Sequence, residues 1–221
     1  MPRQKYRIPP RIRANNNEDR VKLAKSLRSS RRLDSHYNWA VSHTGLSMIS
    51  TNCKVDISSR VTKMENLRKN RSIRVLDLGC LKGRAIIELK EKHPQAECHG
   101  MSLRRDENWR KSPNIHWKVD HAEKMRYPNN YFDFVYSYFG ITHAQKIESS
   151  LKELHRILRR KGETVFNIQF RDLERLIKFG NKDNVLQAIS KVVKHCGFRV
   201  LSTHKFKDGS INSYSFHVQK K

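Results

Sequence analysis

The chain has 221 residues, enough for one domain of ordinary size and an additional segment, so a large multidomain assembly is excluded. Lys and Arg number 46 against 21 Asp and Glu, which gives a formal net charge of +25. This imbalance is larger than solubility requires and indicates a polyanionic partner.

The excess charge is concentrated at the N-terminal end. Residues 1–32 contain eleven Lys and Arg against Glu18 and Asp19, a formal charge of +9. No apolar run reaches the ~18 residues that cross a bilayer, and the chain does not start with the apolar stretch of a secretory signal. We therefore expect an intracellular protein, cytoplasmic or nuclear, without membrane contact. The Arg-rich start also leaves organelle import open, although Pro9 and Pro10 interrupt the helix that such a signal needs.

Cysteine spacing argues against a structural metal. The four cysteines are Cys53, Cys80, Cys98 and Cys196. They form no CxxC pair and no ligand spacing with histidine, so we expect neither a structural zinc site nor a disulfide framework.

The first third of the chain divides into an arm and helical segments. Residues 1–17 are expected to form an extended basic arm. A basic helix is expected over 18–29, with Asn17 as its N-cap. Residues 34–55 have no clean period and are expected to pack on the main domain. A helix over 57–69 begins behind Asp56, a typical N-cap residue.

From residue 73 onward, predicted strands and helices alternate. The strands are expected at 74–78, 97–102, 114–119, 132–137, 164–169, 199–204 and 213–219. The helices are expected at 84–92, 145–159, around 173–177 and at 185–196. Alternation predicts a doubly wound α/β fold with a mostly parallel seven-stranded sheet, closed by a C-terminal antiparallel hairpin.

These elements suggest three parts. Residues 1–33 form the basic extension, 34–72 a helical segment on the core, and 73–221 the α/β domain. In such a sheet a ligand binds beyond the carboxyl ends of the strands, where the first strand turns into its helix.

That first turn has the sequence Val-Leu-Asp-Leu-Gly-Cys-Leu-Lys-Gly over residues 75–83. Gly79 and Gly83 permit a tight turn and close approach of the backbone to a ligand. Asp77, at the strand end, can accept hydrogen bonds from an ammonium group. The turn is therefore the candidate binding site.

The turn resembles the first motif of class I S-adenosylmethionine-dependent methyltransferases, hydrophobic-Leu-Asp-Leu-Gly-Cys-Gly-x-Gly. The Asp-His-Ala-Glu block at 120–123 and the Tyr-Pro-Asn-Asn-Tyr-Phe-Asp block at 127–133 resemble later motifs in family order. His143 and the Arg-Lys-Gly turn at 160–162 continue the series, so the resemblance covers about residues 73–219. It implies a Rossmann-like methyltransferase fold, S-adenosylmethionine as cofactor, and an enzyme.

The resemblance also implies site residues. The cofactor positions are Asp77, Gly79, Cys80, Leu81, Gly83, Ser102, Asp120, His121, Ala122 and Tyr138. Between Asp120 and His121, Asp120 is the preferred adenine contact. His143 is the candidate general base, because the family has a histidine there and its pKa lies near neutrality. A structural His143 and a core position for Tyr138 stay open as alternatives.

Two positions depart from the family pattern. Leu81 replaces the middle glycine of the turn, and Ser102 replaces the acidic residue that would bridge the ribose hydroxyls. Asp106 or Glu107 could reach in its place. Because one hydroxyl cannot replace a carboxylate, we expect weakened cofactor affinity.

Arginines at 104 and 105 admit a different reading, since an arginine after the second strand can bind the 2′-phosphate of NADP. The Gly-x-Gly-x-x-Gly of a dinucleotide site is absent, which disfavours it. The basic N-terminal region favours RNA as the methyl acceptor. The alternative is a catalytically silent domain that binds RNA or a ribonucleoprotein, and a small-molecule methyltransferase is a third possibility.

Overall fold

The computed structural model describes residues 45–68, 71–144, 146–169, 185–208 and 211–221. The arm at 1–17 and the helices expected at 18–29 and 173–177 lie outside these residues. Seven strands are described: β1 (Arg74–Leu78), β2 (Glu97–Ser102), β3 (His116–Val119), β4 (Phe132–Ser137), β5 (Leu158–Gln169), β6 (Phe198–Asp208) and β7 (Ile211–Lys220).

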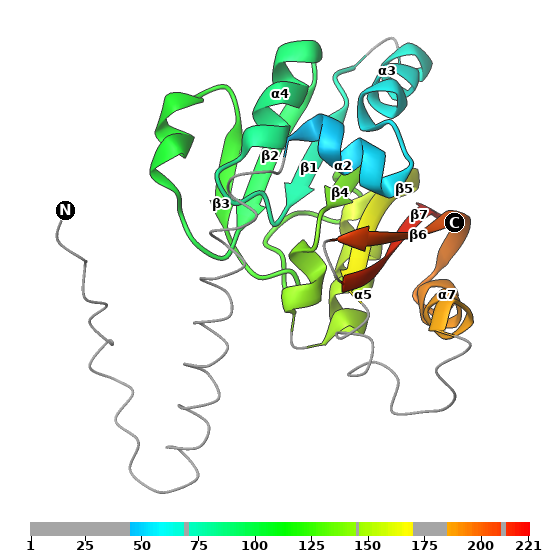
Figure 1. Ribbon diagram of the computed structural model, residues 1–221. Coiled ribbons are helices and arrows are strands. Elements are labelled where there is room, and N and C mark those ends of the chain that lie inside the picture. The colour runs from blue at the N-terminus through cyan, green and yellow to red at the C-terminus, as the bar shows by residue number, and fades with distance from the viewer. Residues whose placement is uncertain (1–44, 69–70, 145, 170–184, 209–210) are drawn as a thin grey trace, which may run out of the picture. The chain divides into compact units, whose positions relative to one another are not determined.

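The strands form one sheet in the order β3-β2-β1-β4-β5-β7-β6 (Figure 1). The five strands from β3 to β5 are parallel to their neighbours, while β7 pairs antiparallel with both β5 and β6. This arrangement confirms the predicted doubly wound, mostly parallel seven-stranded sheet with its C-terminal hairpin.

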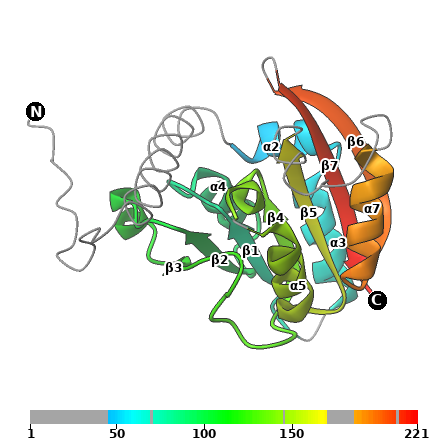
Figure 2. The ribbon, with the colours of Figure 1, turned by 90° about the horizontal axis from the view of Figure 1, so that it is seen from below.

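Helices cover both faces of the sheet. They are α2 (Leu46–Cys53), α3 (Ile57–Leu67), α4 (Arg84–Lys92), α5 (Ile147–Ile157), α7 (Val185–His195) and the short 3₁₀ helices η1 (Glu107–Lys111) and η2 (Gly140–His143). The apolar faces of α2, α3 and α4 share one core cluster, and those of α5 and α7 share the other. Figure 2 shows α5 and α7 in front of the sheet and α3 and α4 behind it.

Alternation along β1 explains how one strand serves both cores. Leu76 and Leu78 are buried in the cluster that includes α5, whereas Val75 is buried in the cluster of α4. Asp77 has the same parity as Val75 and therefore lies on the α4 face. The period of two thus places one carboxylate in an otherwise apolar layer.

Several element boundaries differ from the prediction. Residues 46–53, which showed no clean period, form α2 because Leu46, Ile49 and Cys53 share a buried face. The helix expected over 145–159 ends at Ile157, since Leu158 pairs with Phe132 and starts β5 instead. The strand expected from 114 begins at His116, and β6 and β7 extend beyond their predicted limits.

Helix α3 begins as predicted. The Asp56 side chain accepts a hydrogen bond of 3.0 Å from the backbone N–H of Ser59, which satisfies one of the unpaired donors of the first turn. Within the described residues, no helix combines the length and apolar character needed to cross a membrane.

Candidate cofactor site

The turn between β1 and α4 is held by backbone hydrogen bonds. The N–H groups of Gly79 and Cys80 both donate to the Met101 carbonyl, at 2.8 and 3.0 Å, and Gly83 N–H donates to the Cys80 carbonyl at 2.7 Å. Gly79 has φ +90°, and a Cβ there would lie 2.5 Å from the Gly140 Cα. Only glycine fits this point, because both the backbone angle and the space exclude a side chain.

Leu81 adopts the backbone conformation of a glycine. Its φ is 51°, in the left-handed region, which costs a residue with a Cβ about 1–2 kcal/mol. The departure from the motif therefore changes the side chain and preserves the course of the turn. The Leu81 carbonyl accepts a 2.8 Å hydrogen bond from the Trp109 indole Nε1, which fixes this peptide from outside the turn.

Two stacked tryptophans support the turn. The Trp109 and Trp117 rings lie 4.9 Å apart between centroids at an interplanar angle of 8°. A Cβ on Gly83 would lie 2.2 Å from the Trp117 ring, and one on Gly100 would lie 2.3 Å from it. The lack of side chains at these two glycines therefore makes room for an indole. This stacked pair, here called the Trp109–Trp117 wall, was not predicted, because it depends on how β2 and β3 pair.

Asp77 is a buried acid close to the turn. It is only 4% exposed, and burial raises its pKa to about 7, while the Tyr136 hydroxyl on the paired strand β4 lowers it. Among the described residues, no Lys, Arg or His is recorded in an ion pair with it. A buried carboxyl without a cation is well suited to receive the ammonium group of a ligand.

The end of β2 offers a hydroxyl instead of a carboxylate. Ser102 is 7% exposed and lies at the last position of the strand. Asp106, a possible substitute, accepts a 2.9 Å hydrogen bond from Asn108 N–H and caps η1. Glu107, the other possible substitute, is exposed in the first turn of η1.

The Asp120 carboxylate binds backbone groups of its own loop, which follows β3. It accepts hydrogen bonds from the backbone N–H of His121 at 3.0 Å and of Arg126 at 2.8 Å. Burial alone would raise the pKa of Asp120, but these hydrogen bonds outweigh it and hold the pKa below its usual value. His121 is exposed and Ala122 is half-buried. Asp120 thus shapes the loop, and His121 presents its side chain to solvent.

Residues after β4 form the side of the site next to α2. The Tyr138 hydroxyl accepts a 2.6 Å hydrogen bond from Asn52 Nδ2 on α2, and the Tyr138 and Phe139 rings pack 4.5 Å apart. Tyr138 is 8% exposed. His143 ends η2, directly beyond these rings in the chain. Its part in proton transfer stays a prediction.

One residue of the motif blocks has a structural role. Asp133 is 1% exposed and pairs with the guanidinium groups of Arg68, Arg71 and Arg159. It also accepts a 2.9 Å hydrogen bond from Arg74 N–H at the start of β1. Asp133 therefore anchors the amino end of the sheet, away from the turn.

The site fits one end of S-adenosylmethionine better than the other. The turn supplies a glycine cradle and Asp77 supplies a buried acid, which suit the methionine portion of this cofactor. At the ribose end, Ser102 offers one hydroxyl and Asp106 is already a helix cap. Bound there, the cofactor would supply an activated methyl group, and the chain would supply its orientation.

Comparison with known proteins supports this assignment. Residues 76–166 match the family described as methyltransferase domain. A malonyl-[acyl-carrier protein] O-methyltransferase from Halorhodospira halophila is 31% identical over 101 residues, which cover 42% of this chain and 34% of that protein. The match thus spans about a third of the length of that curated relative.

Solved structures share the fold at low sequence identity. A putative S-adenosylmethionine dependent methyltransferase from Listeria monocytogenes superposes with a TM-score of 0.55 at 17% identity, covering 74% of this chain and 97% of that one. A putative sarcosine dimethylglycine methyltransferase from Galdieria sulphuraria gives 0.56 at 14% identity, covering 74% and 85%. The family match implies S-adenosylmethionine as the cofactor. Residues 76–166 therefore resemble a methyltransferase domain, within a fold that these solved methyltransferase structures share.

Proposed function

We propose that this domain transfers the methyl group of S-adenosylmethionine to RNA. The observation that carries the acceptor assignment is charge. The whole chain has a formal charge of +25, and residues 1–32 contribute +9 of it. The phosphate backbone of RNA is a polyanion that a chain with this charge attracts, and its binding releases counterions.

Exposed cations also occur in the cofactor turn and in and just before η1. The hydrogen bond from Trp109 Nε1 to the Leu81 carbonyl brings η1 beside the turn. These exposed cations are Lys82, Arg105, Arg110 and Lys111, here called the turn cations. A phosphate backbone held by the turn cations would bring a nucleotide close to the methyl donor.

In this proposal each group has a limited task. Asp77 and the turn hold the methionine end of the cofactor, and the loop with His121 and Ala122 faces the adenine. Tyr138 lines the acceptor side, and His143 accepts the proton of the acceptor where one is released. Methyl transfer from a sulfonium is an in-line displacement, so alignment of donor and acceptor contributes most of the rate.

The test uses full-length protein with isotopically labelled S-adenosylmethionine and three acceptors: total RNA, duplex DNA and a small-molecule metabolite pool. Label in RNA supports the proposal, and label only in the metabolite pool contradicts the acceptor assignment. Because the relative acts on malonyl-[acyl-carrier protein], label on a protein-bound acyl group is a further outcome that would contradict the RNA assignment. RNA binding without cofactor binding would instead identify a silent domain, the reading that Leu81 and Ser102 favour.

Charge variants separate local from general electrostatics. Replacing Lys82, Arg105 and Arg110 with Gln should weaken RNA binding about tenfold at physiological salt and reduce its salt dependence. The matched control replaces three exposed cations on α7 and β6, namely Lys191, Lys194 and Arg199. Equal losses in both variants would contradict a role for the turn cations.

Deleting residues 1–32 should also weaken RNA binding while leaving cofactor affinity intact.

A further inference from the structure

Three metal-ligating side chains meet at the amino ends of β2 and β3. Glu97 and His99 are two residues apart on β2 and therefore lie on one face of the sheet. His116, the first residue of β3, is the direct partner of His99 in the parallel register. Pairing of the two strands thus places Glu97, His99 and His116 together, although His116 is distant from the others in sequence.

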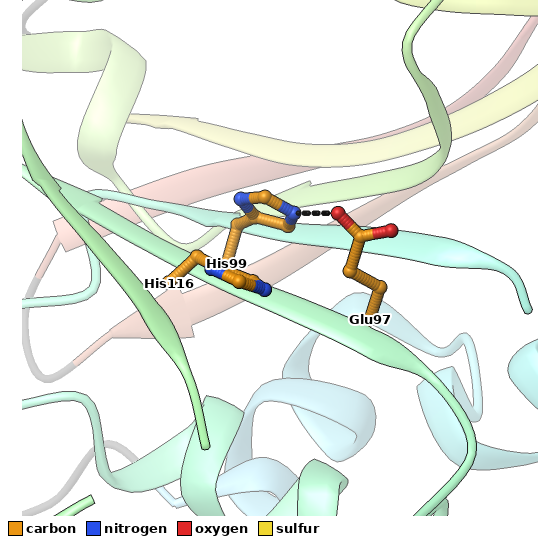
Figure 3. Close-up of side chains that lie close together, drawn as sticks. All are labelled: Glu97, His99 and His116. Carbon is orange, nitrogen blue, oxygen red and sulfur yellow. Dashed lines mark hydrogen bonds and ion pairs between the residues drawn. The ribbon is translucent and has the colours of Figure 1, made fainter. Parts of the chain in front are cut away.

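The donor atoms converge. The Nε2 of His99 lies 3.0 Å from Oε1 of Glu97, and one donor atom from each of the three residues lies within 4.8 Å of the others. The His99 and His116 rings are stacked with centroids 4.7 Å apart at 28°. Figure 3 shows the two imidazoles one above the other, with the Glu97 carboxylate beside the edge of His99.

These separations suit a metal ion. Zinc–nitrogen and zinc–oxygen bonds are about 2.0–2.2 Å, so two ligand atoms at the tetrahedral angle lie about 3.4 Å apart. The 3.0 Å between His99 Nε2 and Glu97 Oε1 is close to that separation. His116 is exposed, so its ring can rotate toward the same point without disturbing the core.

Outer contacts hold the carboxylate in place. Arg74 Nε donates to Oε2 of Glu97 at 2.6 Å, and the Tyr131 hydroxyl donates to Oε1 at 2.9 Å. Hydrogen bonds of this kind orient ligands in metal sites. The Arg74 guanidinium also repels a cation, so the affinity should be moderate.

We propose that Glu97, His99 and His116 bind one divalent transition metal ion of the zinc type. Two imidazoles and one carboxylate suit Zn²⁺ and Co²⁺ better than Mg²⁺ or Ca²⁺, which prefer oxygen ligands. The site lies at the opposite end of β2 from Ser102 and does not depend on the proposed methyl transfer. Its effect is structural, because the ion joins the edge strand β3 to β2.

Calorimetric titration of ZnCl₂ into the full chain tests the site. Wild type should bind Zn²⁺ at a site that His116→Ala weakens at least tenfold, and His195→Ala, an exposed histidine on α7, should behave as wild type. His116 is exposed, so its loss should leave the melting temperature of the metal-free protein unchanged. Equal binding by wild type and His116→Ala, or no binding by wild type, would overturn the proposal.

Co²⁺ provides an independent spectroscopic readout. Nitrogen and oxygen ligation should give visible d–d bands without a thiolate charge-transfer band, and Glu97→Gln should remove the bands that depend on this site. A thiolate band would place the ion on cysteine instead and contradict the assignment.

Discussion

The turn after β1 and the end of β2, where the two ends of the cofactor would bind, are built differently. After β1, positive φ angles at Gly79 and Gly83 and the buried Asp77 form a preorganised cradle. After β2, Ser102 ends the strand with a single hydroxyl, and Asp106 is used to cap η1. The difference indicates that cofactor affinity depends mainly on the methionine end. At the ribose end, a substitution that supplies a carboxylate should increase the affinity.

The largest effect is expected when the cradle is removed. Gly79→Ala places a Cβ 2.5 Å from the Gly140 Cα at a φ of +90°, so the turn must open. S-adenosylmethionine affinity should fall more than a hundredfold in calorimetry. The control is Gly45→Ala, whose Cβ would meet only the ends of flexible side chains, the Glu88 carboxylate at 3.2 Å and the Arg84 Nε at 3.5 Å. Unchanged affinity in Gly79→Ala would show that the turn is not the binding site.

The next effect depends on pH. The pKa of Asp77 in the free protein is about 7, so at pH 6 most molecules carry a neutral carboxyl that cannot pair with an ammonium group. Affinity for S-adenosylmethionine should therefore rise five- to tenfold from pH 6 to pH 7.5. Asp77→Asn should bind weakly at both pH values. A pH dependence that persists in Asp77→Asn would assign the titration to another group.

Asp77 should also affect stability. Because its folded pKa lies above its value of 3.8 in the unfolded chain, the folded state binds more protons between these two values. Without cofactor, this residue should make the protein less stable as the pH rises from about 4 to about 7. Chemical denaturation across that range should show a loss that is absent in Asp77→Asn. Saturating cofactor should reduce it.

A gain of affinity is expected at the other end. Ser102→Asp restores a carboxylate where the ribose hydroxyls of the cofactor should lie, and should strengthen binding five- to tenfold. Ser102→Ala serves as control and should change little. Weaker binding by Ser102→Asp would show that the cofactor does not extend across the end of β2.

The smallest effect concerns the support of the turn. Trp109→Phe removes the hydrogen bond to the Leu81 carbonyl and retains an aromatic ring against Trp117. One such bond contributes about 1 kcal/mol, which corresponds to about fivefold in cofactor affinity. Trp117→Phe, which loses a bond to the Ser112 carbonyl instead, is the comparison. Equal cofactor affinities for Trp109→Phe and wild type would show that this hydrogen bond does not support the cofactor site.

Local signals predicted much of the fold. The bounds of β1, β2, β4 and α4 agree with the sequence because period, caps and turn glycines are encoded within a few residues. The bounds of the amphipathic α2 within the expected helical segment were not predicted, because its three buried residues span only two turns. The end of α5 was misplaced because Leu158 pairs with Phe132, a contact that no local pattern encodes.

The same limit applies to the sites. The glycine turn could be located from the sequence, whereas the Trp109–Trp117 wall and the Glu97, His99 and His116 cluster depend on the β2–β3 register. Cysteine and histidine spacing along the chain therefore gave no sign of the metal ligands. Nor could it show that the Asp120 carboxylate accepts hydrogen bonds within its own loop.

The most direct measurement is calorimetric titration of S-adenosylmethionine into the full-length chain at pH 7.5, with its melting curve recorded in parallel. We expect saturable heat that fits one site per chain and a higher melting temperature with cofactor. A folded protein that gives no heat and no thermal shift would contradict cofactor binding at the turn after β1.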